Sequence, residues 1–233
     1  MLRWSNISRR LTWDILRLSI PAAAATVTMM VGFGLFSRIV GELDAASGVA
    51  GAEAINSAAT TDIVAILKLT FTACIAFGTA TATLVSQSLG AKRPEDAARY
   101  GWASVRLGAL IFGVVGLCEG VLFTPQLVAL ITKSEAVREA MLVPMRMMGV
   151  ATPIIAVAMI LSEALFGAGN TKFVAAAQFL LVFGCLVPVA YVLGVRANLG
   201  LFGIWLSACI YAALAAIAMS TKFHAGEWKK IVL

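Results

Sequence analysis

The sequence predicts an all-α integral membrane protein, a bundle of six transmembrane helices. Two features of the composition favour this class: 61% of the 233 residues are hydrophobic, and only 13% are charged. A soluble domain carries about twice that fraction of charge. The apolar residues gather in six runs, and each is close to or above the roughly 20 residues that a helix needs to cross a bilayer core.

The six predicted spans cover residues 18–40, 54–89, 103–123, 145–166, 172–194 and 200–221. Residues 1–17 precede this transmembrane bundle (18–221) as an amphipathic lead-in, and residues 222–233 follow it as a tail. Arginines alternate with Trp4 and Trp13 in the lead-in, as is typical of a helix lying on the membrane surface. Pro94, followed by Glu95 and Asp96, opens the third helix, where carboxylates meet the positive end of the helix dipole.

Two other stretches carry local signals. In the third span, Gly116-x-x-x-Gly120 has the spacing that lets two helices approach closely in lipid. Thr124, Pro125 and the charged stretch from Lys133 to Glu139 predict an outer loop that contains a short helix. Proline at positions 153 and 188 falls inside the fourth and fifth spans, where it removes one backbone hydrogen bond and favours a kink.

The distribution of Lys and Arg predicts that both termini are cytoplasmic, in a bacterial inner (plasma) membrane. Six spans place both termini on one side, and cytoplasmic segments carry the excess of basic residues. On the side of the termini lie Arg3, Arg9, Arg10, Arg17, Lys92, Arg93, Arg99, Arg106, Lys172, Lys222, Lys229 and Lys230. The other side holds Arg38, Lys133, Arg138, Arg146 and Arg196, so the count is twelve against five.

Several classes of function are disfavoured by the residues themselves. The four cysteines lie in apolar runs without disulfide or metal-ligand spacing, and His224 is the only histidine. No phosphate-binding loop is present, and no nucleophile has a base beside it. We therefore expect no enzyme, no metal and no cofactor. The net charge of +6 belongs to the basic loops and predicts no nucleic-acid partner.

The stretch after the middle of the second span carries a family resemblance. It reads Gly78-x-x-x-Ala82-Thr-Leu-Val-Ser-Gln-x-Leu-Gly-Ala91, followed by Glu95-Asp-Ala-Ala98. Together with Ser19-Ile-Pro21, Ala164-Leu-Phe-Gly-Ala-Gly-Asn-Thr171, Gly203-Ile-Trp205 and the tail Phe223-x-x-Gly226-x-Trp228-Lys229, it resembles the MATE family of multidrug and toxin extrusion transporters. The match extends over nearly the whole chain and is to the C-terminal lobe of that family.

The resemblance implies one six-helix lobe of a twelve-helix secondary transporter. Such a transporter exports small organic, mainly cationic compounds in exchange for protons or sodium, through a cavity between two lobes. The chain would then need a second lobe: a missing N-terminal half, which we favour, a separate chain or a second copy. Two alternatives remain open, a relative that flips a lipid-linked substrate and a membrane subunit that only assembles with others.

Ionisable residues at bilayer depth are costly, so each is a candidate functional residue. Lys68 would bind an anionic group or take part in proton coupling, unless its amine reaches the surface or pairs with Glu119. Glu163 is the stronger candidate for ion coupling and Glu119 the weaker, each with a position near water as the alternative. MATE second lobes often carry an acid in their first span, and residues 21–37 contain none.

Four uncharged polar residues are candidates for the wall of a substrate pathway: Asn56, Thr83, Gln87 and Gln178. The alternative for these, and for Thr79, Thr81 and Ser86, is hydrogen bonding from helix to helix, worth roughly 0.6 kcal/mol for each bond.

Overall fold

A computed structural model describes residues 8–46 and 54–230, and it confirms the all-α class. Among these residues no strand is formed, and six helices are long and apolar enough to cross a membrane. The α-helices are α1 Arg9–Ala46, α2 Ile55–Gly90, α3 Pro94–Leu117, α4 Thr124–Ile131, α5 Glu135–Gly167, α6 Thr171–Leu181, α7 Val187–Tyr191 and α8 Gly200–Ala225. Three π-helical segments, η2 Cys118–Leu122, η3 Val182–Leu186 and η4 Val192–Arg196, and the 3-10 helix η5 Glu227–Lys230 complete the list.

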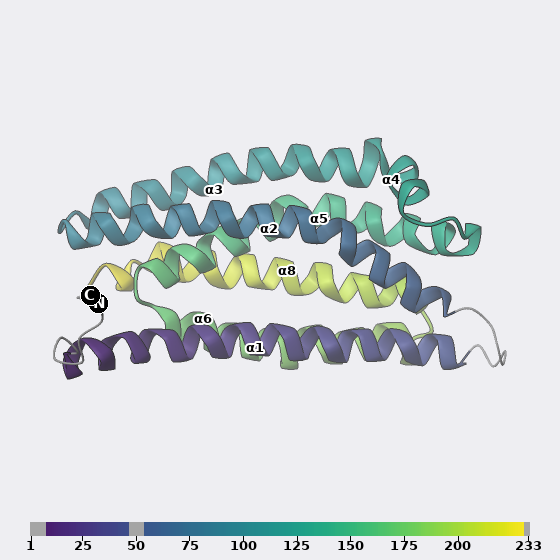
Figure 1. Cartoon of the computed structure of the whole chain (residues 1–233), viewed down its shortest axis with the longest axis horizontal. Coiled ribbons are helices and arrows are strands. Elements are labelled where there is room, and N and C mark those ends of the chain that lie inside the picture. Colours follow the sequence, from purple (N-terminus) through teal and green to yellow (C-terminus); the bar gives the residue numbers. More distant parts are fainter. Residues whose placement is uncertain (1–7, 47–53, 231–233) are drawn as a thin grey trace, which may run out of the picture.

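Helix α5 lies at the centre of the bundle and packs against α2, α3 and α8, whereas α1 pairs mainly with α6 (Figure 1). Helices α2 and α3 therefore form the side of the bundle opposite α1. At one end α1 begins, α2 ends, α3 begins, α5 ends, α6 begins and α8 ends. We call this the basic end, because the larger set of Lys and Arg predicted above lies there, with Arg3 outside the described residues. The opposite end is the far end.

Several predicted boundaries are corrected by the helices. Helix α1 runs without a break from Arg9, so residues 9–17 continue the helix of the first span and are not a separate helix, and the apolar span itself begins at Ile15. Residues 1–7 of the lead-in lie outside the described part. The short helix predicted within the outer loop is α4, Thr124–Ile131, but the loop ends earlier than predicted because Glu135 already begins α5. Helix α8 continues to Ala225, four residues into the predicted tail.

The fifth span is not a regular α-helix. It passes from α6 through η3, α7 and η4, and Pro188 lies in the first turn of α7. Proline has no N–H to donate to the carbonyl four residues earlier, so the turn before it widens to the π pattern, in which Val187 N–H bonds to Val182 O. Pro153, by contrast, is accommodated inside an unbroken α5.

Small residues bring the central helices together, as the glycine spacing predicts. A Cβ atom added to Gly116 or Gly120 would collide with the backbone of Gly149 in α5, and one on Gly149 would collide with Gly120 in return. A Cβ atom on Gly167 would collide with the backbone of Ala82 in α2. Lipid tails are as apolar as side chains, so this close contact of backbones is the main source of packing energy between the spans.

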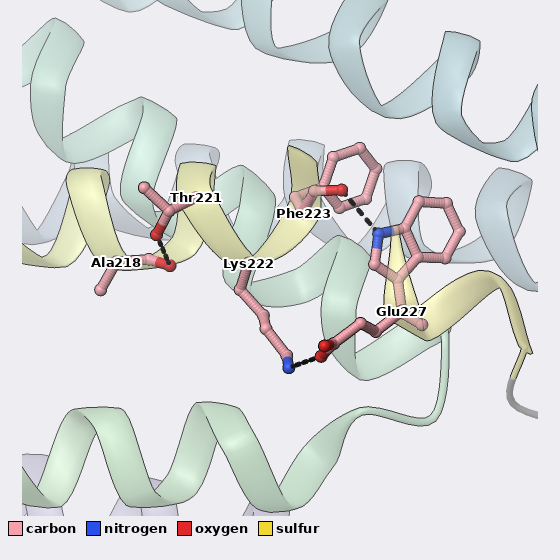
Figure 2. Close-up of polar contacts among 6 residues, drawn as sticks. Ala218, Thr221, Lys222, Phe223 and Glu227 are labelled. Atoms are coloured by element: carbon pink, nitrogen blue, oxygen red, sulfur yellow. Dashed lines mark hydrogen bonds and ion pairs between the residues drawn. The ribbon is translucent and has the colours of Figure 1, made fainter. Parts of the chain in front are cut away.

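The end of α8 is held at the basic end by an aromatic and ionic cluster (Figure 2). Gly226 adopts the left-handed conformation, with φ of 71°, and turns the chain back. The Trp228 ring then stacks on Phe223 at 4.6 Å, and its indole N–H donates to Phe223 O at 2.8 Å. Lys222 and Glu227 form an ion pair, which is visible beside α8 in Figure 2. Trp228 is therefore fully buried, not displayed to lipid as an interfacial tryptophan.

Candidate functional site

One face of α2 carries exposed polar side chains along most of its length. We call this face the α2 polar stripe, and it consists of Thr61, Lys68, Thr72, Thr79, Thr83 and Gln87, all exposed. Their separations of four and seven residues place them on one side of an α-helix. The stripe unites three of the predicted site residues, Lys68, Thr83 and Gln87, on a single surface.

The opposite face of α2 explains why the polar stripe is exposed. Gly78 is buried against Glu163 of α5, and the backbone of Ala82 meets Gly167, so the small residues of α2 face the centre of the bundle. Thr79 follows Gly78 and Thr83 follows Ala82 in the sequence, so both side chains point away from α5 and remain exposed. The close contact with α5 thus determines which side of α2 is left without a partner in this lobe.

The hydroxyl groups of α2 bond within their own helix. Thr79 donates to Ile75 O, Thr81 to Phe77 O and Thr83 to Thr79 O, each at 3.0 Å, and Ser86 donates to Thr83 O. The interpretation as helix-to-helix hydrogen bonds is therefore wrong for these four side chains. Because the donors are already satisfied, the exposed surfaces of Thr79 and Thr83 offer mainly oxygen lone pairs and methyl groups.

Lys68 lies in the interior of the span and does not pair with Glu119. It follows Ile55 by 13 positions, about 20 Å along the helix axis, and its side chain is exposed. Thr70, two positions later and so about 200° around the helix, is buried and donates to Glu119 Oε1 at 2.6 Å. The alternative of a Lys68–Glu119 ion pair is thus wrong, because the two side chains lie on opposite faces of α2.

Glu119 reaches into the packing between α2 and the end of α3. It lies in η2, where the helix widens into a π turn, and Thr124 donates to its backbone carbonyl at 2.9 Å. One carboxylate oxygen accepts the bond from Thr70, but the other, Oε2, is buried and accepts no hydrogen bond from the described residues. Orphaned buried polar atoms are rare in native structures and often mark functional sites, as π turns do.

The structure separates the remaining candidates from the stripe. Glu163 of α5 is half-buried, and its Cβ and Cγ atoms lie against Gly78 on the inner face of α2. Gly78 is 10 residues after Lys68, roughly 15 Å along the helix. Gln178 is half-buried in α6. Neither shares a surface with Lys68, so the predicted residues form no single cluster.

Asn56 belongs to a structural contact at the far end. Its backbone N–H and its side-chain amide both donate to Asp44 Oδ1 at 2.9 Å. The backbone N–H and hydroxyl of Ser57 donate to Asp44 Oδ2 at 2.9 and 2.6 Å. Asp44 from the end of α1 therefore caps the first turn of α2, where free N–H groups favour a carboxylate. The interpretation of Asn56 as part of a pathway has no support in this geometry.

Sequence reasoning missed Thr61 and Thr72 of the polar stripe, and Thr70 and Asp44. The first two have a visible signal, because polar residues recur at steps of four and seven from Lys68. Asp44 also has one, since an Asn-Ser pair at a helix start is a common partner for a carboxylate. For Thr70 there is none, because its contact with Glu119 joins positions 49 residues apart.

Other sites are few in the described part of the chain. It contains no group of three or more His, Cys, Asp or Glu side chains that could hold a metal. Two open grooves lie at the basic end, one of about 510 Å³ on α1 and one of about 590 Å³ on α3.

Comparison with known proteins identifies the relatives of this bundle. A probable multidrug resistance protein NorM of Thermotoga maritima is 25% identical over 220 residues, which cover 93% of this chain and 45% of that relative. The chain therefore spans about half the length of the curated relative that it matches.

Two solved structures share the fold. An outward-facing multidrug resistance MATE family transporter of the MOP superfamily superposes with a TM-score of 0.84 and 21% identity, over 97% of this chain and 50% of that one. A MOP superfamily transporter from Pyrococcus furiosus Vc1, with a binding pocket described as of reverse polarity, gives 0.84 and 22% over the same shares. The MatE family model itself matches residues 21–192, most of the bundle. The chain is a multi-pass membrane protein that belongs to the MatE family.

Proposed function

We propose that the chain forms one six-helix lobe of a secondary active exporter, in which the α2 polar stripe lines a path shared with a second lobe. The exposure of Lys68 and its polar neighbours inside a membrane span is the observation that carries this proposal. Such side chains are costly against lipid and are found where they line water or another bundle. The half-length match to relatives supports the presence of a second lobe in the working transporter.

The proposed substrates are small organic compounds. The relationship to a multidrug resistance protein supports this class, and organic cations are the first group to test. Lys68 is the only charged member of the polar stripe, so the stripe itself favours a compound that also carries a carboxylate. Cationic and zwitterionic compounds should therefore be compared in the same assay.

Glu119 is the proposed site of ion coupling, and the proton is the ion that its surroundings favour. An unpaired carboxylate oxygen inside a membrane protein is costly while it is charged, and protonation removes that cost. Hard metal cations such as calcium take six or more oxygen ligands. A metal cation at Glu119 would therefore need more oxygen ligands than the carboxylate and the Thr70 hydroxyl supply. Proton binding at Glu119 from one side and release to the other would drive exchange.

The proposed location is the bacterial plasma membrane, with the basic end in the cytoplasm. The described Lys and Arg residues of the basic end outnumber those of the far end eleven to five, counted from the two sets given above without Arg3. The positive-inside rule then orients the bundle.

Transport in proteoliposomes tests the proposal. The protein encoded by the complete coding sequence in which this chain occurs should be reconstituted. Uptake of a fluorescent organic cation and of a zwitterion should then be measured with and without a pH gradient. We expect the gradient to accelerate transport at least tenfold in the natural protein and less than twofold in Glu119→Gln, which keeps the shape and the Thr70 contact. Glu163→Gln is the matched control and should keep the response.

Two outcomes would overturn parts of this proposal. If the pH gradient drives no movement of either compound, the exporter function is wrong. If Glu119→Gln keeps the full response while Glu163→Gln loses it, the coupling site lies at Glu163 instead.

A further inference from the structure

The groove on α3 at the basic end has the chemistry of a phosphate site. It has a volume of about 590 Å³ and is lined by Glu95, Ala98, Arg99, Trp102, Ala103 and Arg106. These residues form two rows at steps of three and four, Glu95–Ala98–Trp102–Arg106 and Arg99–Ala103–Arg106, so they lie on one face of the helix. The small side chains of Ala98 and Ala103 form the hollow, and the larger side chains stand around it.

One side of the groove packs on the bundle and the other side is open. Ala98 and Trp102 pack against the core. Helix α3 itself packs mainly against α2 and α5 and lies at the edge of the molecule (Figure 1). Its inner face is buried at Ala97, Gly101 and Val105, whereas Arg99, Ala103 and Arg106 are exposed. In a membrane protein this outer face meets lipid, so the natural occupant of the groove is a lipid molecule.

The charges of the groove are arranged to leave two guanidinium groups free. Glu95 accepts from the Lys229 ammonium at 2.9 and 3.0 Å, so its charge is already compensated. Asp96, next to the groove, forms an ion pair with Arg93, whose Nη1 lies 3.7 Å from Asp96 Oδ2. Arg99 and Arg106 form no ion pair with any carboxylate in the described part of the chain. The groove thus offers two planar donors that suit the oxygens of a phosphate.

The two arginines lie at different depths. Counting from Pro94, Arg99 lies about 8 Å along the helix, near its start, and Arg106 about 18 Å along it, inside the span. The long side chain of an arginine this far into a span extends back toward the headgroups, which is the direction of Arg99. Trp102 lies between them in the sequence, with its ring edge-on to Phe223 at 5.7 Å between ring centres.

We propose that this groove binds the headgroup phosphate of an anionic phospholipid through Arg99 and Arg106, with Trp102 beside the upper acyl chain. Basic residues near the membrane surface attract acidic headgroups in this way. The site is independent of the transport path, because it lies on the outer face of α3, whereas the polar stripe belongs to α2. Through Lys229 and Phe223 it also adjoins the cluster that holds the end of α8, so lipid binding should stabilise that end.

Native mass spectrometry of the full purified chain in detergent tests the site, with phosphatidylglycerol and phosphatidylcholine as probes. We expect the double variant Arg99→Gln/Arg106→Gln to retain at least fivefold less phosphatidylglycerol, with phosphatidylcholine unchanged. The control Lys92→Gln/Arg93→Gln removes the same charge from the same end but outside the groove, and should retain the natural amount. Phosphatidylglycerol, but not inorganic phosphate, should raise the midpoint of thermal unfolding.

The outcomes separate the proposal from its competitors. Equal loss in both double variants would show general attraction to a basic surface and overturn the site. Equal binding of phosphatidylcholine, or displacement of the lipid by millimolar inorganic phosphate, would also overturn it. If the Gln double variant fails to fold, Arg99→Lys/Arg106→Lys decides: the charge is kept but the paired donors are lost, so retention below half supports the site and full retention contradicts it.

Discussion

The two faces of α2 show how one transmembrane helix separates close packing from an exposed polar surface. Toward α5 it presents Gly78 and the backbone of Ala82, and there the helices meet without room for another Cβ atom. On the other side it presents the polar stripe, which includes Lys68 and is exposed in this lobe. Both faces run through the same stretch of sequence, with Gly78 and Thr79 adjacent in the chain.

This difference indicates what each face needs from its residues. The inner face needs small volume, because backbone contact is the packing energy available between helices in lipid. The stripe needs polarity in a place where polarity is costly, which only a water-filled path or a second bundle can compensate. Substitutions on the inner face should therefore change stability, and substitutions on the stripe should change transport. Four predictions test this separation, from the largest effect to the smallest.

Gly167→Ala should cause the largest loss of stability. The added methyl group meets the backbone of Ala82, which cannot move aside as a flexible side chain would, so we expect a cost of about 1–3 kcal/mol in the free energy of unfolding. Thermal unfolding in detergent measures it. Gly34→Ala is the matched control: its Cβ meets nothing within 4 Å, and replacing a helical glycine there should stabilise by about 0.5–1 kcal/mol. Equal effects from both variants would contradict a tight α2–α5 contact.

Lys68→Ala should reduce transport at least tenfold, about 1.4 kcal/mol, without lowering the midpoint of thermal unfolding. The ammonium group is exposed and contacts no carboxylate in the described part of the chain, so its removal breaks nothing in the fold. Leu110→Ala is the control, since Leu110 is 66% exposed but lies on α3 and not on the stripe. The separation of faces fails if Leu110→Ala impairs transport as strongly.

Asp44→Ala should destabilise the far end by about 1 kcal/mol, because the first turn of α2 loses the carboxylate that caps it. Transport by the surviving folded protein should be unchanged. Glu42→Ala, an exposed carboxylate two positions earlier in α1, should stay within about 0.5 kcal/mol of the natural protein. A loss of transport in Asp44→Ala at unchanged stability would return Asn56 to the list of pathway residues.

Thr83→Val should have the smallest effect, a change in transport of less than threefold and no change in stability. The substitution keeps the shape, and the hydroxyl that it removes is already bonded to Thr79 O in its own helix. Initial rates of dye uptake measure the change. A loss as large as that of Lys68→Ala would mean that the stripe binds its substrate through specific hydroxyl contacts.

The comparison also shows how much could be predicted. The six spans, the excess of basic residues at one end and the close contact through Gly116 and Gly120 followed from apolar runs, charge counts and small-residue spacing. The grouping of Lys68, Thr83 and Gln87 did not, although the spacing was visible, because no signal marked which side of α2 would remain open. The Thr70–Glu119 bond and the Asp44 cap join positions that are distant in the sequence, so no local pattern predicts them. The Thr70–Glu119 bond also excluded the Lys68–Glu119 ion pair that the sequence left open.

What the sequence determined by itself is the class of the protein: an all-α membrane bundle of six spans with the motifs of the MatE family. What only the tertiary structure decided is which face of each span is buried. In water, the buried face of a helix is apolar and the exposed face polar, so periodicity reveals both. In lipid both faces are apolar, and the burial of α2 follows from where Gly167 and Gly78 let backbones meet. Lys68 is exposed because that contact buries the opposite face of α2, and the partner residues in α5 are not indicated by any pattern within α2 alone.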